Sequence, residues 1–277
     1  MRVVSWNVNW RTGLARAQGE FLRDLGPDLV ILQEVNPSSA EALWEATELK
    51  WMIQSDPPAG STEPRRRRVV AVCGTEAFSS WQLDLEAPVR ERVLAVDIEH
   101  QGWRGTVISY YAPPGVSWGI TKVAQAQAVT DWICAREGPV ILGADANTPK
   151  LDPVDDAAVR THWHTGFRKL NGGPGDDELW GPSPRHQLKD CLRVWLAADP
   201  SRARDIVPDG PLAVSHYTAK RRNHPGNPRR FDAIWTTADF TVTDVRYLSD
   251  ELGRLSDHAP VVVDLEYEPQ ALVKSVR

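Results

Sequence analysis

The chain has 277 residues, of which 42% are hydrophobic and 25% charged, with a formal net charge of −5. This balance is typical of a soluble globular enzyme and excludes a disordered or fibrous chain. Apolar runs fall far short of the roughly 20 residues that span a bilayer, and Asn7 and Asn9 interrupt the first run before a signal peptide could form, so we expect no membrane insertion and a cytoplasmic location.

Short apolar, β-branched runs recur along the chain and are typical of buried strands. They cover residues 2–8, 28–34, 68–72, 92–98, 105–110, 140–143, 231–235 and 259–265. Residues 14–25 and 124–135 space their apolar side chains about three to four apart, which predicts two amphipathic helices. Because no repeat or linker divides the chain, we expect one domain over residues 1–268 and a C-terminal tail over residues 269–277.

Two segments lack the regular spacing of apolar side chains that predicts a strand or a helix. Residues 148–184 are rich in Pro, Gly and Asp, which predicts long loops with little helix. Residues 216–230 predict a second loop, which is basic. Loops of this length inside a compact domain are usually functional or disordered.

Acid, amide or histidine side chains lie at the ends of five of the predicted strands. The five blocks are residues 4–9, 32–36, 142–147, 230–234 and 255–260. A single Asp or Asn after a strand is more often a turn former or a helix cap. Recurrence at five strand ends favours an active site instead, where a metal ion or a cationic partner keeps the carboxylates ionised.

The same blocks, in chain order, resemble those of the endonuclease/exonuclease/phosphatase superfamily over residues 2–265. The matching blocks are Ser5-Trp6-Asn7-Val8-Asn9, Leu32-Gln33-Glu34-Val35, Tyr110-Tyr111-Ala112-Pro113, Gly143 to Asn147 as a GDxN block with Ala144 inserted, Arg230-Phe231-Asp232 and Ser256-Asp257-His258. The resemblance implies a mixed α/β (α+β) fold, a four-layer αββα sandwich with two packed mixed β-sheets.

A metal site is also implied by this resemblance. Glu34, Asn7 and Asp257 would bind Mg²⁺, with Mn²⁺ as a plausible substitute. Oxygen ligands of this kind suit a hard cation that keeps several of its waters.

The catalytic roles implied by the resemblance describe in-line attack of water on phosphorus. Asp145 would orient or deprotonate the water with help from Asn147. His258, paired with Asp232, would donate to a phosphate oxygen in the transition state. Tyr111 would donate to the phosphate or help the leaving oxygen, although both tyrosines of the block could be ordinary strand aromatics.

Basic side chains near the Asp232 block bear on the substrate. Arg222, Arg229 and Arg230 would bind phosphates, and Tyr110 competes with Tyr111 for a substrate contact. Clustered arginines favour nucleic acid and hence a nuclease, as does the run Arg65 to Arg68 if it contacts substrate. A phosphatase or phosphodiesterase acting on inositol phosphates or other small phosphoesters remains an alternative, and a non-catalytic binding module of the same fold is a third. No obligate protein partner is expected.

Overall fold

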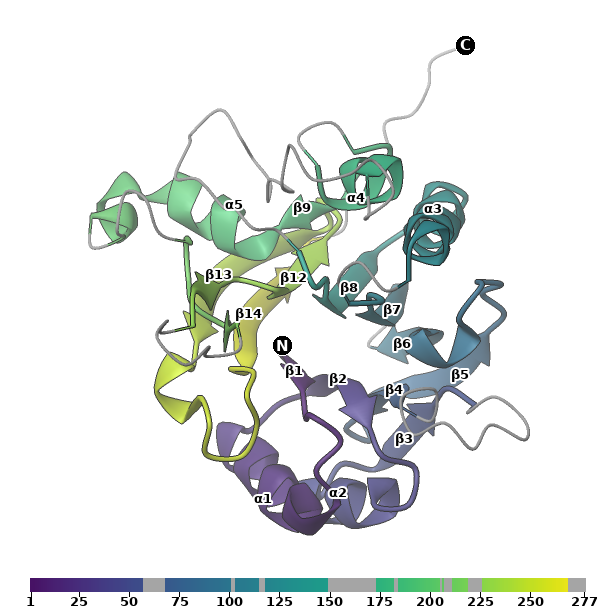
Figure 1. Ribbon diagram of the computed structural model, residues 1–277, viewed down its shortest axis with the longest axis vertical. Coiled ribbons are helices and arrows are strands. Elements are labelled where there is room, and N and C mark those ends of the chain that lie inside the picture. The colour runs from purple at the N-terminus through teal and green to yellow at the C-terminus, as the bar shows by residue number, and fades with distance from the viewer. Residues whose placement is uncertain are drawn as a thin grey trace.

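Two six-stranded mixed β-sheets pack face to face, and helices cover their outer faces (Figure 1). The computed structural model describes residues 1–56, 68–100, 103–114, 118–148, 173–181, 184–204, 206, 211–218 and 226–268. In Figure 1, α1 and α2 lie against the sheet that contains β1 and β2, and α3 and α4 lie on the opposite side of the molecule, beyond β7 and β8. The predicted four-layer αββα sandwich is therefore confirmed.

The first sheet has the strand order β13-β14-β1-β2-β4-β3. Its strands are β1 (Arg2–Asn7), β2 (Leu29–Val35), β3 (Trp51–Gln54), β4 (Val69–Gly74), β13 (Phe240–Tyr247) and β14 (Val261–Tyr267). Strand β1 is parallel to β2 and antiparallel to β14. The two ends of the domain thus pair directly with each other.

The second sheet has the strand order β5-β6-β7-β8-β12-β9. Its strands are β5 (Ser79–Leu83), β6 (Val93–His100), β7 (Trp103–Tyr111), β8 (Val140–Asp145), β9 (Lys189–Asp190) and β12 (Asp232–Thr236). A separate two-stranded ribbon pairs β10 (His216–Tyr217) with β11 (Pro228–Arg229).

Five α-helices and four short 3₁₀ helices connect the described strands. The α-helices are α1 (Ala15–Leu25), α2 (Ala40–Thr47), α3 (Ile120–Cys134), α4 (Gly173–Trp180) and α5 (Cys191–Ala198). The 3₁₀ helices are η1 (Thr12–Leu14), η3 (Arg90–Arg92), η4 (Pro200–Ala203) and η5 (Ser249–Glu251).

Alternation along the central strands divides the hydrophobic core. In β2, Leu29 and Ile31 belong to the core between the sheets, while Val30 and Leu32 belong to the core that includes residues of α1 and α2. Successive side chains of a strand point to opposite faces, so a strand covered on both faces is apolar throughout. This explains why the central strands were predictable from continuous apolar runs.

All eight predicted strands and both predicted helices are present. Six strands were not predicted, namely β3, β5, β9, β10, β11 and β13. Of these, β5 is an edge strand with exposed and half-buried side chains, so it has no apolar run. The loop prediction was wrong for Gly173–Trp180, which form α4, and in part for residues 216–230, whose two ends form the short strands β10 and β11. Leu179 and Trp180 of that helix are buried beside α3, and this tertiary packing overrides the Gly/Pro-rich composition. Residues 149–172 and the predicted tail lie outside the described residues.

No helix in the described part of the chain is long and apolar enough to cross a membrane.

Gly143 lies where the two sheets pack closely together behind the strand ends. A Cβ atom at this position would lie 2.8 Å from Ile31 Cδ1 and 2.9 Å from Ser5 Oγ. The Gln33 side chain bridges the sheets at the same level, since its Nε2 lies 3.3 Å from Ser5 Oγ and 3.4 Å from Ser109 Oγ and Gly143 O. Both facing groups are buried, so neither has room to move away.

We therefore expect Gly143→Ala to lower the free energy of unfolding by roughly 1–3 kcal/mol, because overpacking forces the sheets apart. Urea unfolding followed by tryptophan fluorescence measures this change. Gly13→Ala is the matched control, since a Cβ atom at Gly13 meets nothing within 4 Å. Equal stability of the two variants would contradict this account of the sheet packing.

Candidate active site

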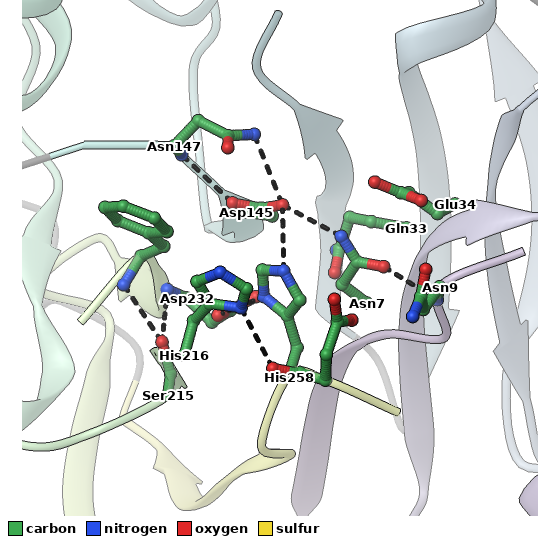
Figure 2. Close-up of polar contacts among 12 residues, drawn as sticks. Asn7, Asn9, Gln33, Glu34, Asp145, Asn147, Ser215, His216, Asp232 and His258 are labelled. Carbon is green, nitrogen blue, oxygen red and sulfur yellow. Dashed lines mark hydrogen bonds and ion pairs between the residues drawn. The ribbon is translucent and has the colours of Figure 1, made fainter. Parts of the chain in front are cut away.

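Polar side chains from both sheets meet at one edge of the sandwich, where several strands end (Figure 2). The parallel strands β1 and β2 end near Asn7 and Glu34, and the parallel strands β7 and β8 end at Tyr111 and Asp145. Asp232 begins β12, which runs antiparallel to β8, and stands opposite Asp145 in the register. The carboxyl ends of parallel strands share an edge, so the topology alone brings these residues together.

Asp145 is at the centre of the hydrogen-bond network. Its Oδ2 accepts from Asn7 Nδ2 at 2.8 Å and from Asn147 Nδ2 at 3.3 Å, and its Oδ1 accepts from the Asn147 backbone N–H at 3.0 Å. Burial raises the pKa of Asp145 to about 7, against the opposing effect of the nearby His258. A carboxylate with a pKa near neutrality is suited to accept a proton from water.

His258 lies between two carboxylates. Its Nδ1 is 2.8 Å from Asp232 Oδ2, and its Nε2 is 3.9 Å from Asp145 Oδ2. Burial disfavours the charged ring, but Asp232 and Asp145 outweigh it and raise the pKa of His258 to about 10. The ring is therefore an imidazolium at neutral pH, with Nδ1–H donated to Asp232 and Nε2–H directed towards Asp145.

Backbone contacts join the first and last blocks of the sequence beneath these side chains. The Trp6 indole donates to the His258 carbonyl at 2.8 Å, and Ser256 Oγ donates to the Asn7 carbonyl at 2.6 Å. Ser256 Oγ also accepts the His258 backbone N–H at 3.1 Å. All four residues are nearly or fully buried, so these bonds fix the relative position of Asn7 and His258.

The backbone is strained at this edge. Among the described non-glycine residues, four with a positive φ lie in the strand-end segments, namely Asn9 (53°), Trp10 (55°), Glu34 (53°) and Asn147 (48°). Glu34 lies where the register between β2 and β4 is irregular, which redirects its side chain. Such conformations cost of order 1–3 kcal/mol each and cluster at functional sites.

Glu34 has a cationic partner that the sequence did not predict. Its Oε2 forms an ion pair with Arg68 Nη1, and only 8% of the Glu34 side chain is exposed. Arg68 also lies over the Trp10 ring, 6.0 Å from its centroid. A nearly buried carboxylate needs a positive charge beside it, and Arg68 supplies that charge here.

The three predicted Mg²⁺ ligands come from different segments of the chain. Asn7 and Glu34 end neighbouring strands, and Asn7 Oδ1 accepts from the Asn9 backbone N–H at 2.8 Å while keeping a second lone pair. Asp257 is exposed and lies close to His216 and His258.

Two groups of three acidic or histidine side chains among the described residues are close enough to share an ion: His216, Asp257 and His258, and Asp145, Asp232 and His258. Glu34 belongs to neither. With Asn7, Glu34 still offers the one carboxylate and neutral oxygen that a largely hydrated Mg²⁺ requires. The donor set at the ends of β1 and β2 therefore fits a hard cation.

Tyr111 faces the site, and Tyr110 does not. Burial, with the negative charges of Glu34 and Asp145, raises the pKa of Tyr111 above its usual range, so its hydroxyl stays a donor. The Arg92 guanidinium lies 4.1 Å from the Tyr111 ring centroid and holds the ring from one face. Tyr110 points to the other face of β7 and packs on Trp180 in the core beneath α3, so the expected substrate contact at Tyr110 does not fit this position.

Of the predicted phosphate-binding arginines, Arg230 is turned into the protein. Its side chain is fully buried, and Nη2 lies 2.7 Å from Asp190 Oδ2. The expectation that Arg230 binds substrate therefore does not fit, because the buried ion pair with Asp190 of β9 needs its charge. Arg229 on β11 is partly buried, which lowers its pKa. Arg222 and residues 65–67 lie outside the described residues.

Sequence reasoning missed Ser215 and His216, which lie against the predicted residues. Ser215 Oγ accepts the backbone N–H groups of Phe231 and Asp232 at 2.9 and 3.0 Å. The His216 ring stacks on His258 with 4.4 Å between centroids. A two-residue strand inside a basic loop has no hydrophobic period, so the only available signal was a histidine shortly before the Asp232 block.

Comparison with known proteins gives a family match and a set of similar folds. The family model described as Endonuclease/Exonuclease/phosphatase family matches residues 4–258. No curated protein matches the chain.

Similar solved structures span the whole domain. D. rerio TDP2 complexed with single strand DNA product has a TM-score of 0.64 and 16% identity, covering 96% of this chain and 98% of that chain. The endonuclease domain of TRAS1, a telomere-specific non-LTR retrotransposon, has a TM-score of 0.58 and 17% identity, covering 98% and 99%. The human Nocturnin catalytic domain with bound sulfate anion has a TM-score of 0.57 and 15% identity, covering 96% and 93%. At such identity these likenesses establish the shared fold alone.

The charge on His258 is open to a direct test with Asp232→Asn. We expect the pKa of His258 to fall from about 10 towards 6.5, because burial still disfavours the cation while its nearest carboxylate is gone. Between about pH 7 and 9 the wild-type ring is then charged and the variant ring neutral. NMR titration of the histidine ring signals measures both values.

Asp264→Asn is the control, since it removes a partly exposed carboxylate paired with Arg2 and leaves the site intact. A His258 pKa that stays equally high in Asp232→Asn and in wild type would show that Asp232 is not the source of the charge.

Proposed function

Because the chain belongs to the Endonuclease/Exonuclease/phosphatase family, we propose that it is a metal-dependent nuclease that hydrolyses phosphodiester bonds of nucleic acid. Membership makes the chain a phosphoric ester hydrolase. The observation that carries the finer proposal is the opposition of Asp145 and His258, with 3.9 Å between Oδ2 and Nε2, at an edge that also offers Asn7 and Asn147. This arrangement offers a proton acceptor and a cationic donor to one phosphate group.

The chain's own residues account for most steps of the proposed reaction. Asp145, held by the two asparagine amides, orients a water for in-line attack and accepts its proton. The His258 imidazolium turns Nε2–H to a non-bridging phosphate oxygen and stabilises the charge that develops there, while Asp232 accepts Nδ1–H and fixes the orientation of the ring. Tyr111 donates its hydroxyl to the phosphate or to the leaving oxygen.

Glu34 and Asn7 would hold the metal ion, Mg²⁺ or Mn²⁺, in this proposal. When bound, such an ion polarises a phosphoryl oxygen and neutralises developing charge. Asp257, which is exposed, would be the third metal ligand, as the sequence resemblance implies. The cytoplasmic location expected from the sequence remains a prediction.

Nucleic acid is the preferred substrate class, and one observation favours the alternative of a small phosphoester. The D. rerio TDP2 structure holds a single-stranded DNA product, and the TRAS1 domain is an endonuclease. Of the three predicted phosphate-binding arginines, however, only Arg229 is both described and partly exposed, because Arg222 lies outside the described residues and Arg230 is buried in its pair with Asp190. Inositol phosphates or other small phosphoesters would need fewer phosphate contacts.

The proposal predicts metal-dependent hydrolysis of a panel that includes plasmid DNA, single-stranded DNA, RNA, inositol phosphates and a generic phosphodiester. We expect turnover in Mg²⁺ or Mn²⁺, and we expect Asp145→Ala and His258→Ala each to lower kcat by about 10²–10⁴-fold. Asp264→Ala is the control, because it removes a carboxylate that lies outside the site and pairs with Arg2. If every substrate survives with the wild type, the hydrolase activity is disproved; if only small esters react, the nuclease proposal is wrong.

Arg68 gives a separate prediction for the metal. Since its guanidinium neutralises Glu34, a cation bound at Glu34 competes with it. We expect Arg68→Gln to tighten Mg²⁺ binding about fivefold, the equivalent of about 1 kcal/mol for a partly exposed ion pair. Isothermal titration measures the affinity, and Arg254→Gln, which removes an exposed arginine paired with Glu251, is the control. Weaker Mg²⁺ binding in Arg68→Gln than in wild type would contradict competition at Glu34.

A further inference from the structure

The outer side of β12 has no strand partner at Asp232 in the described part of the chain. Its neighbour on that side, β9, pairs with Trp235 and Thr236, further along the strand. On the other side, the Phe231 carbonyl accepts the Ala146 backbone N–H at 2.8 Å, and alternate residues of an antiparallel strand turn their peptide groups to opposite sides. The N–H and carbonyl of Asp232 therefore point away from β8 and need other partners.

Two side-chain hydroxyls supply these partners. Ser215 Oγ accepts the backbone N–H groups of Asp232 at 3.0 Å and Phe231 at 2.9 Å, as Figure 2 shows. The Tyr247 hydroxyl on β13 donates to the Asp232 carbonyl at 2.9 Å. Strand β13 belongs to the first sheet and β12 to the second, so the Tyr247 bond joins the two sheets at Asp232. The backbone of Asp232 is thus held on both sides by hydroxyl groups.

Arg230 directs the Tyr247 hydroxyl. Its Nη1 lies 3.3 Å from the Tyr247 oxygen, and its Nη2 lies 2.7 Å from Asp190 Oδ2. A guanidinium only donates, so the Tyr247 oxygen accepts from Arg230 and its own hydrogen is directed to the Asp232 carbonyl. Asp190 is fixed in turn, because it caps α5 by accepting the Leu192 backbone N–H at 3.1 Å. A chain of contacts therefore runs from Asp190 through Arg230 and Tyr247 to the backbone of Asp232.

The Asp232 carboxylate has little support of its own. Its Oδ2 is 2.8 Å from His258 Nδ1, and its Oδ1 has no hydrogen-bond partner among the described residues. The residue is fully buried, so the carboxylate cannot turn to water. Its direction, and with it the orientation of the His258 ring, depends on the backbone that the two hydroxyls hold.

We propose that Tyr247, held by Arg230, is a positioning residue that acts through the Asp232 backbone on the orientation of the His258 ring. The inference rests on the proposed function, in which His258 Nε2–H reaches a phosphate oxygen. A shift of Asp232 turns the ring bonded to it and displaces Nε2–H, while the groups that bind substrate stay in place. A displacement of this kind slows the chemical step and leaves affinity unchanged.

The test is Tyr247→Phe, which keeps the ring and removes the hydroxyl. Hydrolysis of bis(p-nitrophenyl) phosphate in Mg²⁺ gives kcat and KM. We expect kcat to fall about fivefold at unchanged KM, as loss of one buried hydrogen bond allows. The NMR signal of the His258 ring Nδ1–H reports the bond to Asp232 without turnover. It should shift in Tyr247→Phe and exchange with water about fivefold faster.

Two further variants accompany this test. Tyr267→Phe removes a hydroxyl at the opposite end of the pair of β13 and β14, where Tyr267 stands opposite Phe240, and should behave like wild type. Arg230→Lys keeps a positive charge for Asp190, but a single amino group does not span Asp190 and Tyr247 as the guanidinium fork does. It should lower kcat and shift the His258 signal in the same way as Tyr247→Phe.

A kcat and a His258 ring signal in Tyr247→Phe that match those of Tyr267→Phe would overturn the proposal, and so would a higher KM at unchanged kcat. If the wild type hydrolyses no substrate, that result counts against the proposed function alone. The His258 ring signal still decides whether Tyr247 orients the pair of Asp232 and His258.

Discussion

His258 lies between the carboxylates of Asp145 and Asp232 in a region from which water is almost excluded. Burial alone would keep the ring neutral, and two close negative charges reverse that preference. One imidazolium does not balance two ionised carboxylates, so a proton or a further cation must compensate when Asp145 is charged. The same edge holds Glu34, which already requires Arg68. A centre with this excess of negative charge is suited to recruit a metal ion together with a phosphate group.

The sequence predicted the central strands because they are buried on both faces. β1, β2, β4 and β8 read as continuous apolar runs, and the sites of polar interruption at Asn7, Glu34 and Asp145 coincide with the strand ends. Edge strands such as β5 and short helices such as α4 were not predictable, since their side chains are mixed in character and their stability comes from tertiary contacts. The four-layer arrangement itself came from the family resemblance.

The same distinction applies to the candidate site, where local motifs identified some residues and tertiary contacts determine the position of the others. The motifs identified Asp145, Asn147, Asp232 and His258, which the fold brings into hydrogen-bond or close electrostatic contact. Neighbouring side chains of a strand point to opposite faces, and the register of β7 against β8 decides which of them faces the site. Tyr111 lies opposite Asp145, and Tyr110 lies in the core. Local sequence also gives no sign that Arg230 pairs with Asp190, forty residues away, because that contact forms only when β12 meets β9. His216 was missed for a related reason: its position depends on the bridge to His258.

The position of a bound metal ion tests most directly whether Glu34 and Asn7 form the metal site. The described residues also offer a second cluster for a cation, at His216, Asp257 and His258. Crystals soaked in Mn²⁺ and measured at an anomalous wavelength would locate the ion. The account predicts a peak beside Glu34 and Asn7, with Arg68 displaced from the Glu34 carboxylate. A peak at His216, Asp257 and His258 with none at Glu34 would contradict it.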